Sequence, residues 1–422
     1  MISQKNILIC IIIFLTILSY FIGFYLNENS AGAGSFTGDI NHVWKNLQIY
    51  LNNDVFISLS SSEYYSNRPP LLYIFHKYLN PLTDNINTFR ISVFFFSMSA
   101  PLVFYFCLKK KYPNSDKLHL ILLSSLILLS PYFRTSSFWG LEENFGIISV
   151  LVAFIFYFKY LKLRSTYNLF LLAFFSSLCV YFDQKSLVIP MIFFLDIIFF
   201  NNIPIKKKFI LILFFVLFSL PYLYLIFKWK GIFPPSHKDF HDFKILLFDN
   251  IIYTISILGI YFIPFLLLRK NNITIFTELF YKKLFLFSLV TLILFIFYVE
   301  IFFLRPDFNF HSSFDGGGAI RKLSFILFQN VIVQKILLSL SVIISWIIIC
   351  SFIDKRNIYI ILFYIILSPF IYPLYQETFD PIILILILLF FLKVSKFNFK
   401  SLTLIYFYFT IFLVSSIIYY LK

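Results

Sequence analysis

Most charged side chains in this sequence lie in short segments between long apolar runs, and two of these segments combine residue types that could do chemistry. Asp39 and His42 follow the first apolar run, and Arg68 precedes a pair of prolines. A carboxylate can act as a general base that accepts a proton from a hydroxyl group. The planar guanidinium of arginine can bind two oxygens of a phosphate. These residue types indicate a group transfer in which a hydroxyl attacks and a phosphate leaves.

Further candidates fall in the same set of connecting segments. We expect the catalytic residues to be Asp39, Glu142 and Glu143. We expect the substrate-binding residues to be His42, Arg68, Asp183, Lys185, His237, His241, Arg305 and Arg321. The cationic members of this set could stabilise negative charge on a departing phosphate.

Several of these residues also fit ordinary structural roles. Asp39 could be the N-cap of a helix that starts at Ile40, and the spacing alone favours catalysis and capping about equally. Glu142 and Glu143 could equally cap the apolar helix that follows them, since acids favour a helix N-terminus. Asp183 could simply reach the membrane surface from the end of its apolar run.

The sequence offers no clear metal site, so no cofactor is expected, with a divalent metal at the adjacent carboxylates Glu142 and Glu143 as the alternative. His237 and His241 have the spacing of a helical ligand pair, with Asp239 between them. The preceding Pro234 and Pro235 indicate an irregular loop, which favours substrate contact over zinc. All four cysteines lie inside apolar runs without a CxxC spacing, which is typical of small buried side chains.

The composition requires a membrane to position these residues. The chain is 60% hydrophobic and 22% aromatic, and its mean hydropathy is +0.87. Apolar runs of roughly 17–25 residues recur along the whole length, each long enough to cross a bilayer. We expect an all-α, polytopic integral membrane protein with about 12 to 13 transmembrane helices. The predicted spans are 7–25, 88–108, 118–133, 145–163, 167–182, 187–203, 208–228, 248–268, 281–304, 330–352, 358–373, 377–393 and 401–420.

The net charge of +15 reflects the predicted topology and gives no reason to expect nucleic acid as a partner. Lysine and arginine concentrate in alternate connections, which is the positive-inside pattern. This pattern places the N-terminus in the cytoplasm and the candidate residues on the periplasmic or lumenal face. We expect a bacterial inner membrane, or an endoplasmic reticulum membrane in a eukaryote. The first apolar run, of about 19 residues, is longer than a signal-peptide core and favours an uncleaved anchor.

The loops on the predicted active face contain no large soluble domain. Residues 1–422 therefore form a single predicted transmembrane domain, with a first extracytoplasmic loop at 26–87 and a late one at 305–329. Within the first loop, residues 41–52 have apolar side chains at helical spacing. Residues 69–80 form a second predicted helix that starts at the two prolines. We expect both to lie on the membrane surface and to wall a cavity at the level of the lipid headgroups.

This arrangement resembles the GT-C superfamily of polytopic glycosyltransferases. Those enzymes use polyprenyl-phosphate sugars and keep a catalytic acid in the first extracytoplasmic loop, where Asp39 lies. Residues 68–73 resemble the proline-rich start of the second membrane-surface helix in that superfamily. The resemblance implies an inverting transfer from the lipid phosphate. The protein-mannosyl and aminoarabinose transferases share this layout.

Within the superfamily, the chain is most similar to the dolichyl-phosphate-glucose alpha-1,2-glucosyltransferase family. That family reads Asp-Glu, then His, then Pro-Pro-Gly-Leu-Tyr, and the corresponding positions here are Asp39, His42 and residues 69–73. Segments 138–142, 183–186 and 231–241 resemble its later motifs in the same order. The sequence differs from the family motifs at two positions: the double acid is reduced to Asp39, and the family's Arg is replaced by Asp183. The identity of the sugar and of the acceptor therefore does not carry over from the family.

The expected function is therefore transfer of a hexose or pentose from a polyprenyl-phosphate donor to a lipid-linked or envelope glycan. Asp39 is the expected general base, and membrane lipids are expected partners. An O-antigen polymerase or ligase is the alternative, because residues 305–329 form a modest late loop with Arg and His. A polysaccharide flippase or other transporter is less favoured, since most charges lie at span ends and no internal repeat is visible.

Overall fold

The computed structural model describes residues 4–32, 38–66, 68–231, 234, 249–268, 316–371, 374–394 and 396–421. These residues form helices and connecting loops, and no strand occurs among them. Seven of the helices are long and apolar enough to cross a membrane: Gln4–Tyr25, Ile86–Lys111, Glu143–Leu163, Ile205–Trp229, Asn250–Leu268, Val333–Phe352 and Phe399–Tyr420. The chain is thus an all-α, multi-pass membrane protein, as the apolar runs predict.

Within the described residues, some predicted spans form helices that are too short to cross a membrane. The predicted span 118–133 is divided at Pro131 into two helical segments that are bent by 68°, and counting them as one gives up to 8 spans. Proline has no N–H to continue a helical ladder, and it is favoured at the start of the next helix. Residues 382–389 are 0–6% exposed, so this apolar run is a buried core segment. The predicted span 281–304 lies outside the described residues.

The chain divides into two compact units. Unit 1 comprises Met1–Asp242, Ser395–Leu402 and Tyr406–Lys422. Its elements are α1 (Gln4–Tyr25), α2 (Asp39–Asn52), α3 (Val55–Ser58), α4 (Leu71–Leu79), α5 (Ile86–Ser97), α6 (Ser99–Lys111), α7 (Lys117–Ser125), η1 (Leu126–Leu129), α8 (Pro131–Phe138), α9 (Glu143–Leu163), α10 (Thr166–Phe182), η2 (Gln184–Leu187), α11 (Val188–Phe200), α12 (Ile205–Trp229) and most of α20 (Phe399–Tyr420).

Unit 2 comprises Phe243–Val394 and Thr403–Ile405. Its described elements are α13 (Asp249–Phe262), η4 (Ile263–Leu268), α16 (Gly318–Leu327), α17 (Val331–Phe352), α18 (Ile358–Leu367), η5 (Ser368–Phe370), η6 (Gln376–Thr378), α19 (Ile382–Leu386) and η7 (Ile387–Phe391). Within this unit α13 packs against α17. Gly316, Gly317 and Gly318 all have positive φ, and the Gly317 N–H donates to the Leu374 carbonyl at 2.8 Å.

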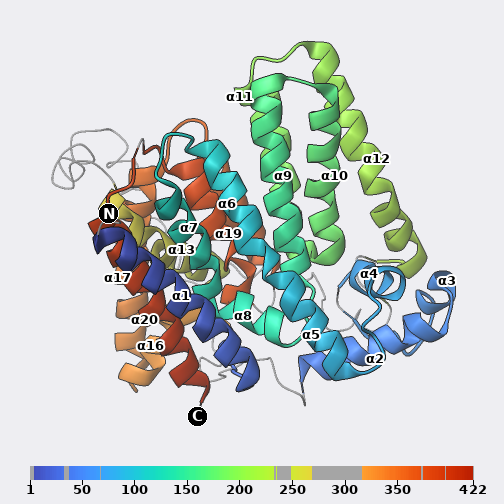
Figure 1. Cartoon of the computed structure of the whole chain (residues 1–422), viewed down its shortest axis with the longest axis horizontal. Helices are drawn as coiled ribbons and strands as arrows, with labels where there is room; N and C mark the ends of the chain where they lie inside the picture. The colour runs from blue at the N-terminus through green and yellow to red at the C-terminus, as the bar shows by residue number, and fades with distance from the viewer. Residues whose placement is uncertain are drawn as a thin grey trace. The chain divides into compact units, whose positions relative to one another are not determined.

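The long helices of unit 1 pack in sequence order around α9. Helix α9 lies between α6 and α10, and α12 lies on the other side of α10 (Figure 1). Helix α1 packs against α7. The Tyr406 hydroxyl of α20 donates to Thr16 Oγ1 at 2.6 Å and lies 3.1 Å from Ser125 Oγ, which ties α20 to α1 and α7.

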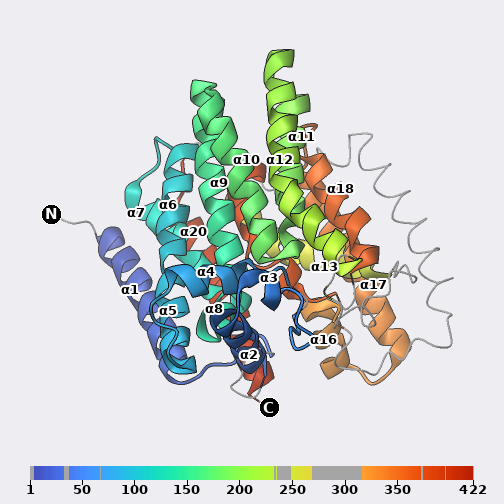
Figure 2. The same ribbon diagram turned by 90° about the vertical axis from the view of Figure 1, so that its right-hand side faces the viewer.

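Three short helices, α2 to α4, gather near one end of α10 (Figures 1 and 2). Helix α2 buries one side, which consists of Ile40, Val43, Asn46, Leu47 and Tyr50. Apolar residues at this spacing favour a helix that covers a larger body with one face. The two short helices predicted in the first loop are confirmed. Helix α4 starts at Leu71, one residue after the second proline, because Pro70 is its N-cap residue.

Candidate active site

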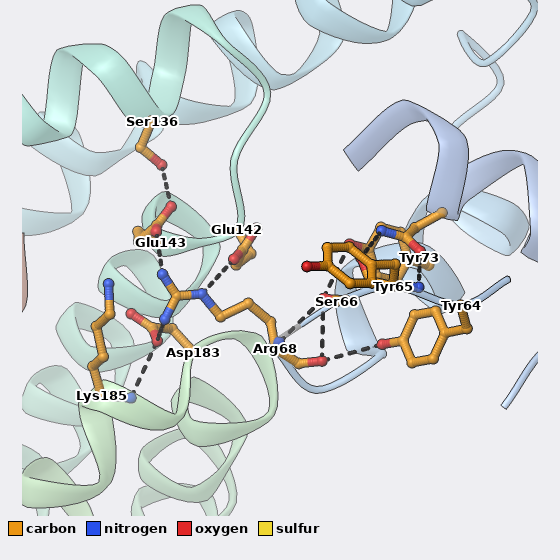
Figure 3. Close-up of polar contacts among 11 residues, drawn as sticks. Tyr64, Tyr65, Ser66, Arg68, Tyr73, Ser136, Glu142, Glu143, Asp183 and Lys185 are labelled. Carbon is orange, nitrogen blue, oxygen red and sulfur yellow. Dashed lines mark hydrogen bonds and ion pairs between the residues drawn. The ribbon is translucent and has the colours of Figure 1, made fainter. Parts of the chain in front are cut away.

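The candidate site is a cluster in which one guanidinium bonds three carboxylates (Figure 3). Arg68 Nε donates to Glu142 Oε1 at 2.7 Å. Arg68 Nη2 donates to Glu143 Oε1 at 3.0 Å, and Nη1 donates to Asp183 Oδ1 at 3.0 Å. We call these four residues the Arg68 cluster. It joins the loop before α4 to the start of α9 and the end of α10.

The acids of the cluster stand where helices begin and end. Glu142 occupies the N-cap position of α9, but its side chain makes no capping hydrogen bond and bonds Arg68 instead. Side-chain capping therefore does not explain Glu142. Gly140, just before it, has a φ of +73°, which lets the chain turn sharply between α8 and α9. Asp183 follows the last residue of α10, and its Oδ1 also accepts from the Lys185 N–H at 3.1 Å.

The cluster is buried and has more negative than positive groups. The side chains of Arg68, Glu142, Glu143 and Asp183 are 11%, 9%, 18% and 6% exposed. Burial, followed by the charge of Glu143, raises the pKa of the Glu142 carboxyl to about 8, although Arg68 acts in the opposite direction. A protonated Glu142 leaves one guanidinium facing two carboxylates, so burying the cluster costs less.

The three acids differ in how many of their oxygens are bonded. Glu143 uses both oxygens, because Oε2 also accepts from Ser136 Oγ at 3.1 Å. Glu142 accepts from Arg68 through Oε1, and its own backbone N–H adds a hydrogen bond to the carboxyl group. Glu142 is 7% exposed as a residue. Within the described chain it therefore has one side-chain donor, whereas Glu143 has two.

Helix α2 holds the loop that carries Arg68. Asn46 Nδ2 donates to the Tyr65 carbonyl at 2.7 Å, and the Tyr65 N–H donates to Asn46 Oδ1 at 2.9 Å. The Arg68 N–H donates to Ser66 Oγ at 3.1 Å, and the Tyr64 hydroxyl donates to the Arg68 carbonyl at 3.1 Å. These bonds fix both ends of the segment from which the Arg68 side chain extends (Figure 3).

Two buried tyrosines form the wall beside Glu142. The rings of Tyr64 and Tyr73 lie 6.0 Å apart, and Tyr73 stacks on Tyr50 at 5.3 Å. Burial raises the pKa of the Tyr64 and Tyr73 hydroxyls well above the usual value, and the charge of Glu142 adds to the effect. Both hydroxyls are therefore neutral at physiological pH.

Asp39 and His42 lie on α2, whose buried side supports the loop. Gly38 is the N-cap residue, so Asp39 is the first residue inside the helix and does not hold the capping position. The spacing of Asp39, His42 and Asn46 places all three on the same side of α2. Seven residues of helix separate Asp39 from Asn46, which is about 10 Å along the axis. His42 is exposed, and its ring centroid lies 5.9 Å from that of Tyr65.

The remaining predicted residues are not brought to this cluster by anything that the structure describes. Arg321 belongs to unit 2, where it is 3% exposed, donates Nη1 to the Gly316 carbonyl at 3.2 Å and lies over the Tyr253 ring at 5.4 Å. His237, His241 and Arg305 lie outside the described residues, as do 305–315 of the predicted late loop.

Sequence reasoning missed the residues that position the cluster. Asn46 is 3% exposed and stands among the apolar side chains of α2, and a polar residue on that stripe was the available signal. Ser136 and Ser66 gave no signal, because single serines are common in such loops. No group of three or more His, Cys, Asp or Glu side chains that could hold a metal ion occurs among the described residues.

An open hollow of about 610 Å³ adjoins α3 in unit 1. It is lined by Asn53, Phe56, Ile57, Ser60, Ser61, Ser62 and Glu63. The Trp229 indole N–H at the end of α12 donates to the Leu59 carbonyl at 3.4 Å and fixes this loop against the long helices. The hollow is therefore bounded by α3 and by the first part of the loop that runs on to Arg68.

The sequence matches no model of a known protein family, and no curated protein matches it.

Proposed function

We propose that this protein is a membrane glycosyltransferase that transfers a hexose or pentose from a polyprenyl-phosphate donor to a lipid-linked or envelope glycan acceptor. The observation that carries the proposal is the Arg68 cluster at the ends of apolar helices, covered by amphipathic helices. Ionisable groups buried beside membrane spans are costly and are most often retained for function. A lipid-linked phosphate would present its charge at this depth.

In the proposed reaction, Asp39 accepts the proton of the attacking hydroxyl. A positioned base of this kind raises the reaction rate about 10²–10⁴-fold. The position of Asp39 at the start of α2 supports this role, because its carboxylate does not have to serve as the N-cap residue. Arg68 supplies a fixed positive charge that offsets the growing charge of the phosphate. Lys185, whose backbone N–H bonds Asp183, is the second basic residue at this end of α10 that we propose for phosphate.

The proposed active face is periplasmic in a bacterial inner membrane, or lumenal in an endoplasmic reticulum membrane. Its support is the distribution of lysine and arginine, which places the N-terminus in the cytoplasm by the positive-inside pattern. The motifs shared with GT-C enzymes support the same orientation.

The test is donor consumption by membranes that contain the full-length protein, with a panel of polyprenyl-phosphate sugars and lipid-linked glycan acceptors. We expect one donor to be consumed by the wild type and Asp39→Asn to lose at least about 100-fold in transfer rate. Asp54→Asn is the matched control, because Asp54 is an exposed acid in the same loop whose side chain makes no capping bond. Transfer at the wild-type rate by Asp39→Asn would remove Asp39 from the mechanism. Failure of every donor would remove the proposed function.

A further inference from the structure

We propose that Glu142 is the general acid of the transfer and that it donates a proton to the phosphate oxygen that leaves the sugar. The inference rests on the proposed function and deepens it by assigning a role to one acid of the Arg68 cluster. Its basis is geometric: Glu142 has one side-chain donor among the described residues, Arg68, and stands directly beside that guanidinium.

The bonding pattern distinguishes Glu142 from its neighbours. Glu143 is bonded through both oxygens, to Arg68 and to Ser136, so moving a proton there would break an existing contact. Asp183 shares Oδ1 between Arg68 and the Lys185 N–H, so that oxygen already has two donors. Among the described side chains Glu142 accepts from Arg68 alone, at 2.7 Å between Nε and Oε1. A neutral carboxylic acid keeps that bond through its carbonyl oxygen and still has a hydroxyl to donate.

The charges around Glu142 favour its protonated form. The groups that face it are Arg68 from the loop before α4, Glu143 on α9, Asp183 after α10, and the neutral Tyr64 and Tyr73 hydroxyls. Lys185 on η2 bonds Asp183 through its backbone N–H. Burial and the two neighbouring carboxylates outweigh Arg68 and raise the pKa of Glu142 to about 8. The Glu142 carboxyl is therefore mainly protonated at physiological pH.

A neutral Glu142 also lowers the electrostatic repulsion between the three acids of the cluster and the phosphate of the donor. With all three carboxylates ionised, the cluster would repel the donor, because like charges at close range disfavour binding. With Glu142 protonated, the phosphate meets a hydrogen-bond donor next to the guanidinium. The same proton that permits binding is then available for the leaving group.

The step balances as follows. The bond between the sugar C1 and the phosphate oxygen breaks, and its electron pair stays on that oxygen, which takes the proton from Glu142. The acceptor oxygen forms the new bond to C1 and gives its proton to Asp39. The reaction leaves Glu142 ionised and Asp39 protonated, and exchange with water restores both for the next turnover.

The test compares Glu142→Gln with Glu143→Gln. Glutamine at 142 keeps the acceptor oxygen for Arg68 Nε and a donor for the phosphate, but it has no proton to transfer. We expect Glu142→Gln to lower kcat by about 100-fold or more while KM for the donor changes less than about threefold. We expect the wild-type kcat to fall as pH rises above about 8 and this alkaline limb to vanish in Glu142→Gln. Glu143→Gln, a positioning variant, should keep the alkaline limb.

Several outcomes would overturn the inference. Glu142→Gln with wild-type kcat, or with the alkaline limb intact, would show that the proton comes from elsewhere. If Glu142→Gln does not fold, the wild-type profile decides, because a kcat that stays constant to pH 9.5 is incompatible with an acid of this kind. If the wild type transfers the sugar and Glu142→Gln transfers it at the same rate, only this inference is rejected. If the wild type transfers sugar from no donor, the proposed function is rejected.

Discussion

Arg68 Nε and Glu142 Oε1 lie 2.7 Å apart although 74 positions separate the two residues in the sequence. The same guanidinium reaches Asp183, which is 115 positions away. One side chain thus connects the first loop to two helix ends, and its removal should affect both stability and activity.

Substituting Arg68 by alanine should destabilise unit 1 by about 3–5 kcal/mol, because buried carboxylates would remain without their cation. Arg68→Lys should recover only part of this loss, since a single ammonium cannot match three donors of a planar fork. The measurement is denaturant or thermal unfolding of the purified protein in detergent. Lys45→Ala, at an exposed position of α2, should unfold like the wild type, and equal stability of Arg68→Ala would contradict the role of the cluster.

Glu142 should make the wild type less stable as pH rises. Its pKa in the folded protein is about 8, above the ordinary value of 4.5, so the folded state keeps a proton that the unfolded state loses. The contribution is therefore fully present below pH 4.5 and is lost as pH rises to about 8. Glu142→Gln should flatten the unfolding free energy between these values. An unchanged slope in that variant would show that other groups dominate.

Asn46→Ala should loosen the loop that carries Arg68. The substitution removes both bonds to the partly buried Tyr65 backbone, and each lost bond costs about 0.5–1.5 kcal/mol. Hydrogen–deuterium exchange should show faster exchange of the Tyr65 amide, together with lower transfer activity. Asn52→Ala is the control, because Asn52 is exposed at the end of the same helix. Equal exchange in the two variants would argue against this support.

A second buried ion pair should show strong coupling. Arg134 Nε and Nη2 bond Glu28 Oε1 and Oε2 at 2.7 and 2.5 Å, which joins the end of α1 to α8. Glu28→Gln alone should destabilise the protein by about 3–5 kcal/mol, since Arg134 would be left buried without its partner. The double variant Glu28→Gln with Arg134→Met should be more stable than Glu28→Gln. Additive losses in a double-mutant cycle would reject the coupling.

Hydropathy and helical spacing predicted the fold class and the two short helices of the first loop. The period of apolar residues in α2 was sufficient, because one face of that helix is buried. Within the described residues fewer helices reach full span length than the hydropathy predicts, since hydropathy cannot distinguish a lipid-facing run from a buried one such as residues 382–389.

The residues of the candidate site were predicted, but their pairing was not. Arg68 was selected in the first loop before the two prolines, and Glu142, Glu143 and Asp183 were selected as acids at the ends of apolar runs. Their mutual bonds depend on how α9 and α10 pack, and no local pattern encodes contacts over 74 to 115 positions. Sequence reasoning therefore assigned Arg68 to phosphate alone and did not anticipate its three carboxylate partners.

The distance along the chain between Arg68 and its partners also sets an order of assembly. Arg68 emerges from the ribosome well before Glu142, Glu143 and Asp183, and chains fold from the N-terminus as they are made. During synthesis Arg68 therefore lacks these three carboxylate partners until the hairpin of α9 and α10 has been inserted into the membrane. The bonds of Arg68 then connect the first loop to helices that are synthesised later. A chain truncated before Asp183 should therefore lack the bond that fixes this loop to the end of α10.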